Sequence, residues 1–187
     1  MVVRLIPTKR FSDERGWFSE TYNAAVFETF GVRDIFQQDN HSLSVKKYVL
    51  RGLHYQRPPH AQAKLVRCLR GRIFDVAVDL RAGSPTYGQW VGSELTAENG
   101  NQLFIPIGFA HGFLTLEDNT EVIYKVSDFY DPGSEGGLLW DDRDLTIAWP
   151  LEGATPSLSP KDRSLARLRE IRPPFAYDGE PLSLIEV

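Results

Sequence analysis

The sequence has little sulfur, no long hydrophobic run and no excess of positive charge. Its 187 residues include one cysteine, Cys68, which has no partner for a disulfide within the chain. The opening run Met1–Pro7 is too short, and too soon interrupted, for a signal peptide or a membrane span. These features predict a cytoplasmic protein without a membrane segment.

The sequence also lacks a basic excess and a dinucleotide-binding turn, which limits the functions that it can have. The formal net charge is -4 at pH 7, whereas a protein that binds the backbone of nucleic acids needs a basic surface to neutralise many phosphates. A single nucleotide ligand is compatible with this charge. No predicted strand is followed by the glycine-rich turn that binds a dinucleotide, so the sequence predicts no redox cofactor.

What the sequence does contain is a repeated alternation of apolar and polar residues. In the run 72–80, Phe74 and Val76 fall on one face and Asp75 and Asp79 on the other, as in a half-buried strand. Hydrophobic residues make up 42% of the chain, enough for the core of one domain over residues 1–187. Strands are predicted near residues 2–6, 17–22, 35–43, 48–56, 62–70, 72–81, 87–95, 101–105, 111–117 and 121–128. Many short, evenly spaced strands favour a sandwich or a barrel.

Helix is predicted in only two places. One runs from Ala24 to Phe30 and is closed by Gly31. The other spans 160–170, where Ser159 and the residues after it form the pattern of a helix start. The tail from residue 173 onward is predicted to lie on the surface as a strap.

Four polar residues on the predicted strands suggest a proton-transfer site. His54 lies in the run 51–56 and His111 in the run 106–113, with Lys64 and Tyr124 on strands near them in sequence. Alternation places Lys64 and Tyr124 on the same strand faces as apolar neighbours, so both side chains are expected to point inward. Taken singly, a histidine or a tyrosine on a strand is commonly a structural residue, and a lysine at a strand end is most often a solvated surface charge.

The spacing Gly-x5-Pro-x-Gly-x2-His over residues 100–111 resembles the second motif of the cupins, a superfamily of small jelly-roll barrels. In metal-binding cupins the first motif supplies two histidines and a glutamate. Here His54 is followed two residues later by Gln56, and no glutamate lies in the next ten residues. This departure predicts that the protein holds no catalytic metal.

A closer resemblance covers nearly the whole chain. Ordered runs of residues are similar to those of the dTDP-4-dehydrorhamnose 3,5-epimerase family: 13–20, 38–42, 51–56, 64–67, 74–79, 106–113, 124–125 and 158–162. The resemblance implies an all-β, cupin-like jelly roll with short peripheral helices. It also implies a cofactor-independent epimerase that converts dTDP-4-keto-6-deoxy-D-glucose to dTDP-4-keto-L-rhamnose by inversion at C3 and C5.

The implied reaction needs a base on one face of the sugar, an acid on the other, and a group that stabilises the enolate between them. By resemblance, His54 takes the proton, Asp162 orients the imidazole, Lys64 donates to the enolate oxygen and Tyr124 returns a proton. Asp162 has a second interpretation, because three residues after Ser159 it also suits a helix cap.

The resemblance implies a further set of residues that contact the nucleotide sugar. Cationic side chains suit the diphosphate, an aromatic ring stacks on the thymine, and polar side chains contact the base, ribose or sugar. The set comprises Arg15, Phe18, Glu20, Gln38, Asp39, Asn40, Arg51, Lys64, His111, Tyr130, Glu135 and Lys161. In this family the N-terminal strands cross to a partner subunit, so Arg15, Phe18 and Glu20 are expected to complete the neighbour's site in a homodimer.

Strict alternation conflicts with one part of this site. It places Arg51 and His54 on opposite faces of their strand, although the resemblance requires both at the ligand. A bulge at Gly52 is therefore predicted.

Three other functions stay open from the residues alone. One is a related epimerase that inverts a single centre. Another is a metal-dependent cupin such as a dioxygenase. The third is a non-catalytic jelly roll that binds carbohydrate.

Overall fold

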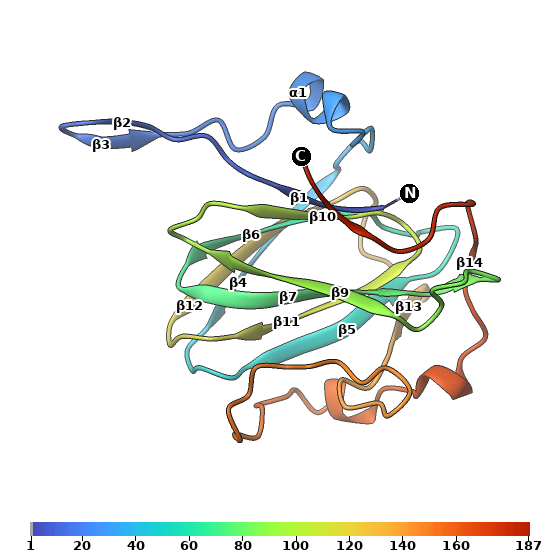
Figure 1. Cartoon of the computed structure of the whole chain (residues 1–187). Coiled ribbons are helices and arrows are strands. Elements are labelled where there is room, and N and C mark those ends of the chain that lie inside the picture. Colours follow the sequence, from blue (N-terminus) through green and yellow to red (C-terminus); the bar gives the residue numbers. More distant parts are fainter. Residues whose placement is uncertain (1) are drawn as a thin grey trace.

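The computed structural model describes residues 2–187 and arranges most strands in two facing sheets (Figure 1). The larger sheet has the order β15 (Leu184–Glu186), β1 (Val3–Ile6), β10 (Gln102–Ile105), β6 (Lys64–Arg70), β12 (Thr120–Val126) and β4 (Gln38–Ser44). The smaller has the order β13 (Glu135–Gly137), β5 (Leu50–Gln56), β11 (Phe109–Thr115), β7 (Arg72–Asp79) and β9 (Trp90–Thr96). The predicted all-β jelly roll is confirmed.

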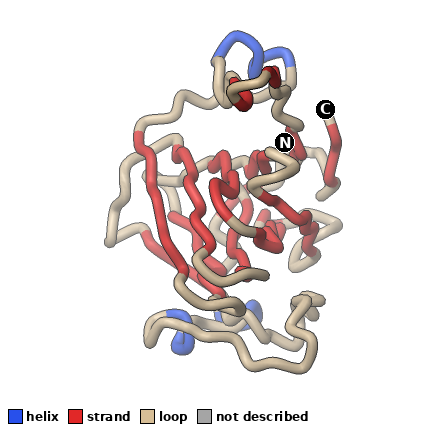
Figure 2. Tube along the Cα trace, turned by 90° about the vertical axis from the view of Figure 1, so that its left-hand side faces the viewer, coloured by secondary structure: helices blue, strands red, loops and turns tan. Residues whose placement is uncertain are grey.

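The main core lies between the two sheets. Val66 and Leu103 from the larger sheet are fully buried against Ile73 and Phe113 from the smaller one. Each belongs to a strand whose alternate residues point inward, so two apolar faces are removed from water together. Figure 2 shows the strands in the middle of the molecule and the helical turns at its two ends.

The expectation that the run 72–80 is half-buried is wrong. Asp75 faces the interior and is fully buried, and Val76 and Val78 on the other face are fully buried as well. Leu145 and Phe175, from the C-terminal third of the chain, cover that outer face. This segment runs beneath β5 in Figure 1. Alternation reports which residues share a face, but it does not report that the face with Asp75 points between the sheets or that a distant segment covers the apolar face.

The first predicted helix is confirmed and the second is wrong. Helix α1 (Ala24–Thr29) begins after Asn23, whose Oδ1 accepts the Ala25 N–H at 3.1 Å. The span 160–170 instead forms two short 3-10 turns, η1 (Asp162–Ser164) and η2 (Leu168–Glu170). The chain is extended at Leu165, and Ala166 forms an isolated bridge with Leu138, so tertiary pairing replaces a continuous helix.

Several short strands were not predicted. The expected strand 17–22 is limited to β3 (Gly16–Phe18), which pairs with β2 (Phe11–Asp13) in a hairpin that extends away from the barrel (Figure 1). The tail from residue 173 lies on the surface as predicted, and it also contributes strands. Its β14 (Phe175–Ala176) pairs with β8 (Arg81–Ala82), and β15 pairs with β1. Within residues 2–187, no helix is long and apolar enough to cross a membrane.

Candidate active site

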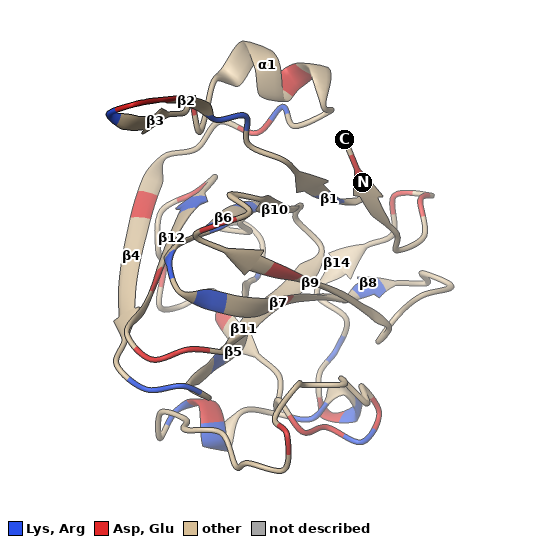
Figure 3. Cartoon of the chain, turned by 60° about the vertical axis from the view of Figure 1, so that its left-hand side comes forward, with Lys and Arg blue, Asp and Glu red and all other residues tan. Residues whose placement is uncertain are grey.

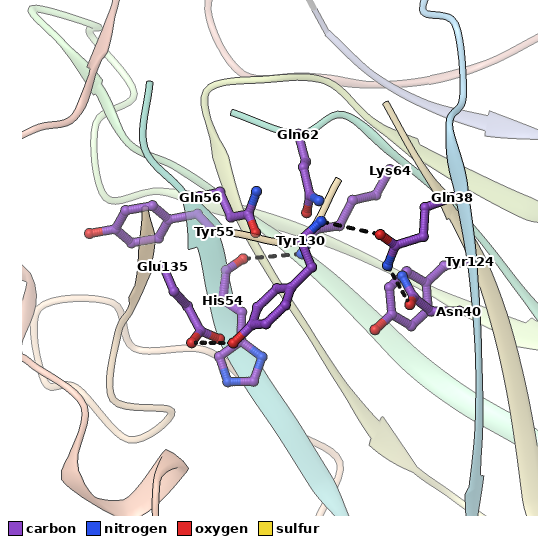
Figure 4. A pocket seen from close by; sticks show the side chains of 10 residues that line it. All are labelled: Gln38, Asn40, His54, Tyr55, Gln56, Gln62, Lys64, Tyr124, Tyr130 and Glu135. Atoms are coloured by element: carbon purple, nitrogen blue, oxygen red, sulfur yellow. Dashed lines mark hydrogen bonds between the residues drawn. The ribbon is translucent and has the colours of Figure 1, made fainter. Parts of the chain in front are cut away.

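Two adjoining hollows of about 250 and 230 Å³ open between the sheets and share His54, Lys64 and Tyr124. Figure 4 shows the first of them, with side chains from both sheets directed into it. Its lining residues are Gln38, Asn40, His54, Tyr55, Gln56, Gln62, Lys64, Tyr124, Tyr130 and Glu135. The second is lined by Ser42, Arg51, His54, Lys64, His111, Phe113, Tyr124, Ser159, Lys161 and Asp162. The four residues proposed for proton transfer on separate strands therefore meet in one place.

His54 forms a pair with a buried carboxylate. Its Nε2 lies 2.6 Å from Oδ1 of Asp162, whose residue is 4% exposed. Burial by itself would raise the pKa of Asp162, but the hydrogen bond and the charge interaction with His54 outweigh it and the pKa is lowered. The ionised carboxylate accepts the Nε2–H, which leaves the Nδ1 lone pair as the basic position of the imidazole.

Of the two interpretations of Asp162, the geometry supports the pair with His54 rather than a helix cap. Its backbone N–H donates to Oγ of Ser159 at 3.0 Å, so Ser159 caps the turn η1. The Asp162 side chain is then free to reach His54 rather than cap the turn itself.

The predicted bulge at Gly52 is confirmed. On β11, His111 faces His54 and Phe113 faces Arg51, so Gly52 and its successor together oppose a single residue. The φ angle of Gly52 is 122°, and a Cβ atom there would lie 2.6 Å from a backbone carbon of β11. Glycine is required for this bulge, which places Arg51 and His54 on the same side of the strand.

Lys64 points into the pocket, as alternation predicted. The residue is 8% exposed, and its Nζ donates to the backbone carbonyl of His54 at 3.4 Å. Burial lowers the pKa of the ammonium to about 8, although the negative charges of Asp75 and Glu135 act in the opposite direction. The Lys64 ammonium therefore loses its proton more readily than an exposed lysine does.

Tyr124 also points inward, between the buried residues Val122 and Val126 of β12. Its ring centroid lies 6.4 Å from that of His111. Burial raises the pKa of the phenol, and the positive charge of Arg51 offsets the rise in part. The hydroxyl thus stays protonated at neutral pH, as an acid requires.

His111 is held by a partner that the sequence did not reveal. Its Nε2 lies 2.7 Å from Oδ1 of Asp75, and both residues are buried. Burial lowers the pKa of His111, and the charge of Asp75 opposes this effect. A carboxylate in the middle of a mostly apolar strand was the available signal for Asp75, but only the pairing of β7 with β11 brings it to His111.

The remaining predicted contacts fall partly in the pocket. Arg51 and Lys161 line the second hollow, and Gln38, Asn40, Tyr130 and Glu135 line the first. The Tyr130 hydroxyl donates to Glu135 at 3.1 Å, and Lys161 forms an ion pair with the same carboxylate. Burial would raise the pKa of Glu135, but these two hydrogen bonds lower it.

Asp39 is not brought into the pocket, so its predicted ligand contact is corrected. Alternation along β4 turns Gln38 and Asn40 inward and Asp39 outward, where it pairs with Lys125 at 2.9 Å. The same rule would have identified Ser42, which sequence reasoning missed although it follows Asn40 by two residues.

The three N-terminal residues of the predicted site also lie outside both hollows. Arg15 lies in the turn between β2 and β3 and pairs with Asp13 at 2.5 Å. Figure 3 shows charged residues of both signs at this end of the hairpin. Phe18 is 70% exposed. Glu20 lines a separate hollow of about 220 Å³ between the N-terminal arm and α1. Within one subunit these residues do not reach His54.

Among residues 2–187, no three His, Cys, Asp or Glu side chains are placed so that they could together hold a metal ion. Gln56 stands where metal-binding cupins have a second histidine. Its amide donates to the backbone carbonyls of His60 and Phe129.

Comparison with known proteins agrees with this geometry. The family model for dTDP-4-dehydrorhamnose 3,5-epimerase matches residues 2–170. A Salmonella typhimurium protein of that name is 55% identical over 161 residues, 86% of this chain and 87% of the relative. A solved structure of a dTDP-6-deoxy-D-glucose-3,5-epimerase from Legionella pneumophila in complex with dTDP-4-keto-L-rhamnose has 47% identity and a TM-score of 0.88, covering 94% of this chain and 93% of that one.

A more distant solved structure is a 3'-monoepimerase from Streptomyces bikiniensis in complex with dTDP-quinovose. It has 34% identity and a TM-score of 0.83, covering 89% of this chain and 84% of that one. The barrel and its polar pocket define a cupin-type jelly-roll enzyme. The chain belongs to the dTDP-4-dehydrorhamnose 3,5-epimerase family.

Proposed function

We propose that this protein is a cofactor-independent epimerase that inverts C3 and C5 of dTDP-4-keto-6-deoxy-D-glucose and gives dTDP-4-keto-L-rhamnose. The observation that carries the proposal is the His54–Asp162 pair, which shares one pocket with Lys64 and Tyr124. A base held by a carboxylate, a buried cation and a protonated phenol are the groups that an enolate mechanism needs.

In the proposed mechanism, Nδ1 of His54 removes a proton from the carbon next to the ketone. The electron pair of that C–H bond forms the enolate, and the Lys64 ammonium donates a hydrogen bond to its oxygen. Tyr124 then gives its hydroxyl proton to the carbon from the opposite face, which inverts the centre. Asp162 keeps its charge throughout and stabilises the imidazolium that His54 becomes.

The nucleotide is proposed to lie toward the first hollow. Tyr130 stacks on the thymine, and Arg51 and Lys161 contact the diphosphate, where cationic donors suit phosphate oxygens. The polar lining residues Gln38, Asn40 and Glu135 contact the base, ribose or diphosphate. His111, oriented by its carboxylate partner, donates to the sugar or the diphosphate.

We further propose a homodimer in which the N-terminal hairpin crosses to the neighbouring subunit, where Arg15, Phe18 and Glu20 complete the site. An isolated two-stranded hairpin has little stability of its own. Trp17 is 55% exposed and Phe18 70%, an apolar surface that a partner would cover.

We also propose that the protein is a single domain and that it is located in the cytoplasm. Residues 1–187 form one domain in this proposal, which is supported by the pairing of β1 with β15 in the larger sheet. Met1 lies outside the described residues. Cys68 is buried with a free thiol, which suits the reducing cytoplasm.

The test is incubation of the protein with dTDP-4-keto-6-deoxy-D-glucose in heavy water, with deuterium at C3 and C5 followed by NMR. We expect label at both carbons and product of inverted configuration. H54A is expected to bind dTDP and to exchange neither position. Absence of label at both carbons with the wild-type protein would refute the epimerase.

The same experiment decides between the proposed activity and the alternatives. Label at one carbon identifies a single-centre epimerase, the activity named for the 34% identical protein from Streptomyces bikiniensis. The double-centre activity is favoured here because the relative with 55% identity is named a 3,5-epimerase. Binding of the sugar nucleotide without exchange would indicate a non-catalytic jelly roll. Elemental analysis that finds stoichiometric iron, nickel or manganese would favour a metal-dependent cupin.

A further inference from the structure

We propose that Gln38, Gln56 and Gln62 position Tyr130 for its nucleotide by holding the backbone of residues 128–131. The three glutamines are called the glutamine cradle below. The inference rests on the proposed function, because it assigns the cradle to the nucleotide end of the same pocket. None of its members is proposed to touch the reacting carbons.

The cradle makes one bond to each of four consecutive residues. Two of its amide nitrogens donate to carbonyls, and two of its amide oxygens accept backbone N–H groups. In chain order these bonds are Gln62 Nε2 to Asp128 O at 2.7 Å, Gln56 Nε2 to Phe129 O at 3.1 Å, Tyr130 N to Gln38 Oε1 at 3.1 Å, and Asp131 N to Gln56 Oε1 at 2.8 Å. The backbone on both sides of the Tyr130 ring is therefore tied to glutamine side chains.

The cradle connects the loop to both sheets. Gln38 lies on β4 of the larger sheet, Gln56 lies on β5 of the smaller sheet, and Gln62 lies just before β6. All three line the first hollow together with Tyr130 (Figure 4). The loop thus lies across the opening between the sheets.

Gln56 is the central member. It is 4% exposed and lies two residues after His54 on the same strand, so its position and that of the base are set together. Its Nε2 donates to two carbonyls, of His60 at 2.6 Å and of Phe129, while its Oε1 accepts from Asp131. A carboxylate of the same size cannot donate, and a thioether forms neither bond well, so an amide is required at this buried position.

Outside the cradle, the loop is held at its two ends, by the pair of His60 with Asp128 at 3.1 Å and by the bond from the Ser134 N–H to the Asp131 carbonyl at 3.2 Å. Phe129 is 59% exposed and Tyr130 54%, so burial of their side chains does not anchor them. Tyr130 also bonds to Glu135, but that contact directs only the hydroxyl end of the ring. The backbone bonds of the cradle therefore determine where the stacking face is presented.

The test is a double-mutant cycle on dTDP affinity, measured by calorimetry with Q56M, Y130A and the double variant. Stacking of a base on an aromatic ring contributes enough for a loss of about tenfold when it is misplaced. We expect Q56M to weaken dTDP binding about tenfold in the wild-type background and by less than about twofold when Tyr130 is already alanine. For turnover, KM is expected to rise more than kcat falls.

Q89M is the matched control, because Gln89 is exposed and lines neither hollow, and it should bind dTDP as the wild type does. Q62M removes one cradle bond from a less buried position, so it replaces Q56M in the test if Q56M does not fold. We expect Q62M to weaken dTDP binding about threefold, and this loss should also disappear in the Y130A background. Unchanged dTDP affinity in both variants, or equal losses with and without Tyr130, would overturn the inference. If the wild-type protein binds dTDP but exchanges no deuterium, the epimerase is refuted. The double-mutant cycle still tests the cradle, because it measures dTDP affinity and not turnover.

Discussion

His54 Nε2 and Asp162 Oδ1 lie 2.6 Å apart although the two residues are separated by 108 positions in the chain. The contact exists because the segment after β13 returns to the smaller sheet, where Ala166 pairs with Leu138 and η1 packs against β5. The carboxylate arrives from a segment that covers the barrel rather than from a barrel strand.

Replacing Asp162 by asparagine should lower kcat by roughly 10²- to 10⁴-fold, because the amide no longer fixes the tautomer of His54 or stabilises its charged form. Steady-state kinetics and dTDP affinity measure the effect, and the affinity should change little. S159A is the control: it removes the bond to the Asp162 backbone while keeping the carboxylate, and it should cost far less. Equal losses in the two variants would mean that Asp162 acts only through the turn.

The rate of epimerisation should fall as the pH rises through about 8. Burial lowers the pKa of Lys64 to about 8, so the ammonium that donates to the enolate is present below this pH and is lost above it. A pH profile of kcat/KM between 6 and 10 measures this limb, because kcat/KM reports groups of the free enzyme. In K64R the guanidinium keeps its charge over that range, so whatever activity is left should show no such limb. An unchanged limb in K64R would assign it to another group.

Replacing Lys64 by methionine should abolish turnover and yet stabilise the fold at pH 7 by about 1–3 kcal/mol. The lowered pKa means that the unfolded chain binds the Lys64 proton more tightly than the folded one, so wild-type stability rises as the pH goes from about 8 toward 10.5. Urea unfolding at pH 7 and at pH 10 should show the advantage of K64M shrinking at the higher pH. A destabilised K64M at pH 7 would show that the bond to the His54 carbonyl dominates.

Replacing Tyr124 by phenylalanine should separate proton removal from inversion. His54 is intact, so it should still exchange the substrate hydrogen with solvent on its own face, while inverted product falls by roughly 10²-fold or more. Deuterium wash-in and product configuration, both followed by NMR, distinguish the two events. Wild-type inversion by Y124F would remove the phenol as the acid.

Mixing two inactive variants should restore activity if the hairpin crosses between subunits. R15A keeps a complete base, and H54A keeps a complete hairpin, so each mixed dimer contains one intact site. After joint unfolding and refolding at equal amounts, we expect about a quarter of wild-type turnover, and less than this from either variant alone. No recovery on mixing would place Arg15 in its own subunit's site or outside the site.

Most of the fold followed from local pattern. Alternation in strands such as β7 and β12 identified which residues share a face, and Gly31 marked the end of the predicted first helix. The predicted C-terminal helix failed because Ala166 pairs with Leu138, a contact that no local pattern contains.

The candidate site, like the fold, was predicted from the sequence only in part. The inward directions of Lys64 and Tyr124 were predicted from two-residue periodicity. The bulge at Gly52 was predicted from the conflict between this periodicity and the family resemblance. Asp39 was assigned to the ligand against that periodicity, and it points outward to Lys125. The partner of His111 came from a neighbouring strand, which periodicity along one strand cannot report.

The sequence by itself determined an all-β barrel, the strand faces and the residue types for an enolate reaction, because these depend on neighbours two residues apart and on ordered motifs. Only the tertiary structure decided between the two interpretations of Asp162, which carboxylate meets His111, how far burial shifts the pKa of Lys64, and which glutamines hold the Tyr130 loop. Those properties depend on segments that come together only when the sheets close and exclude water from the groups between them.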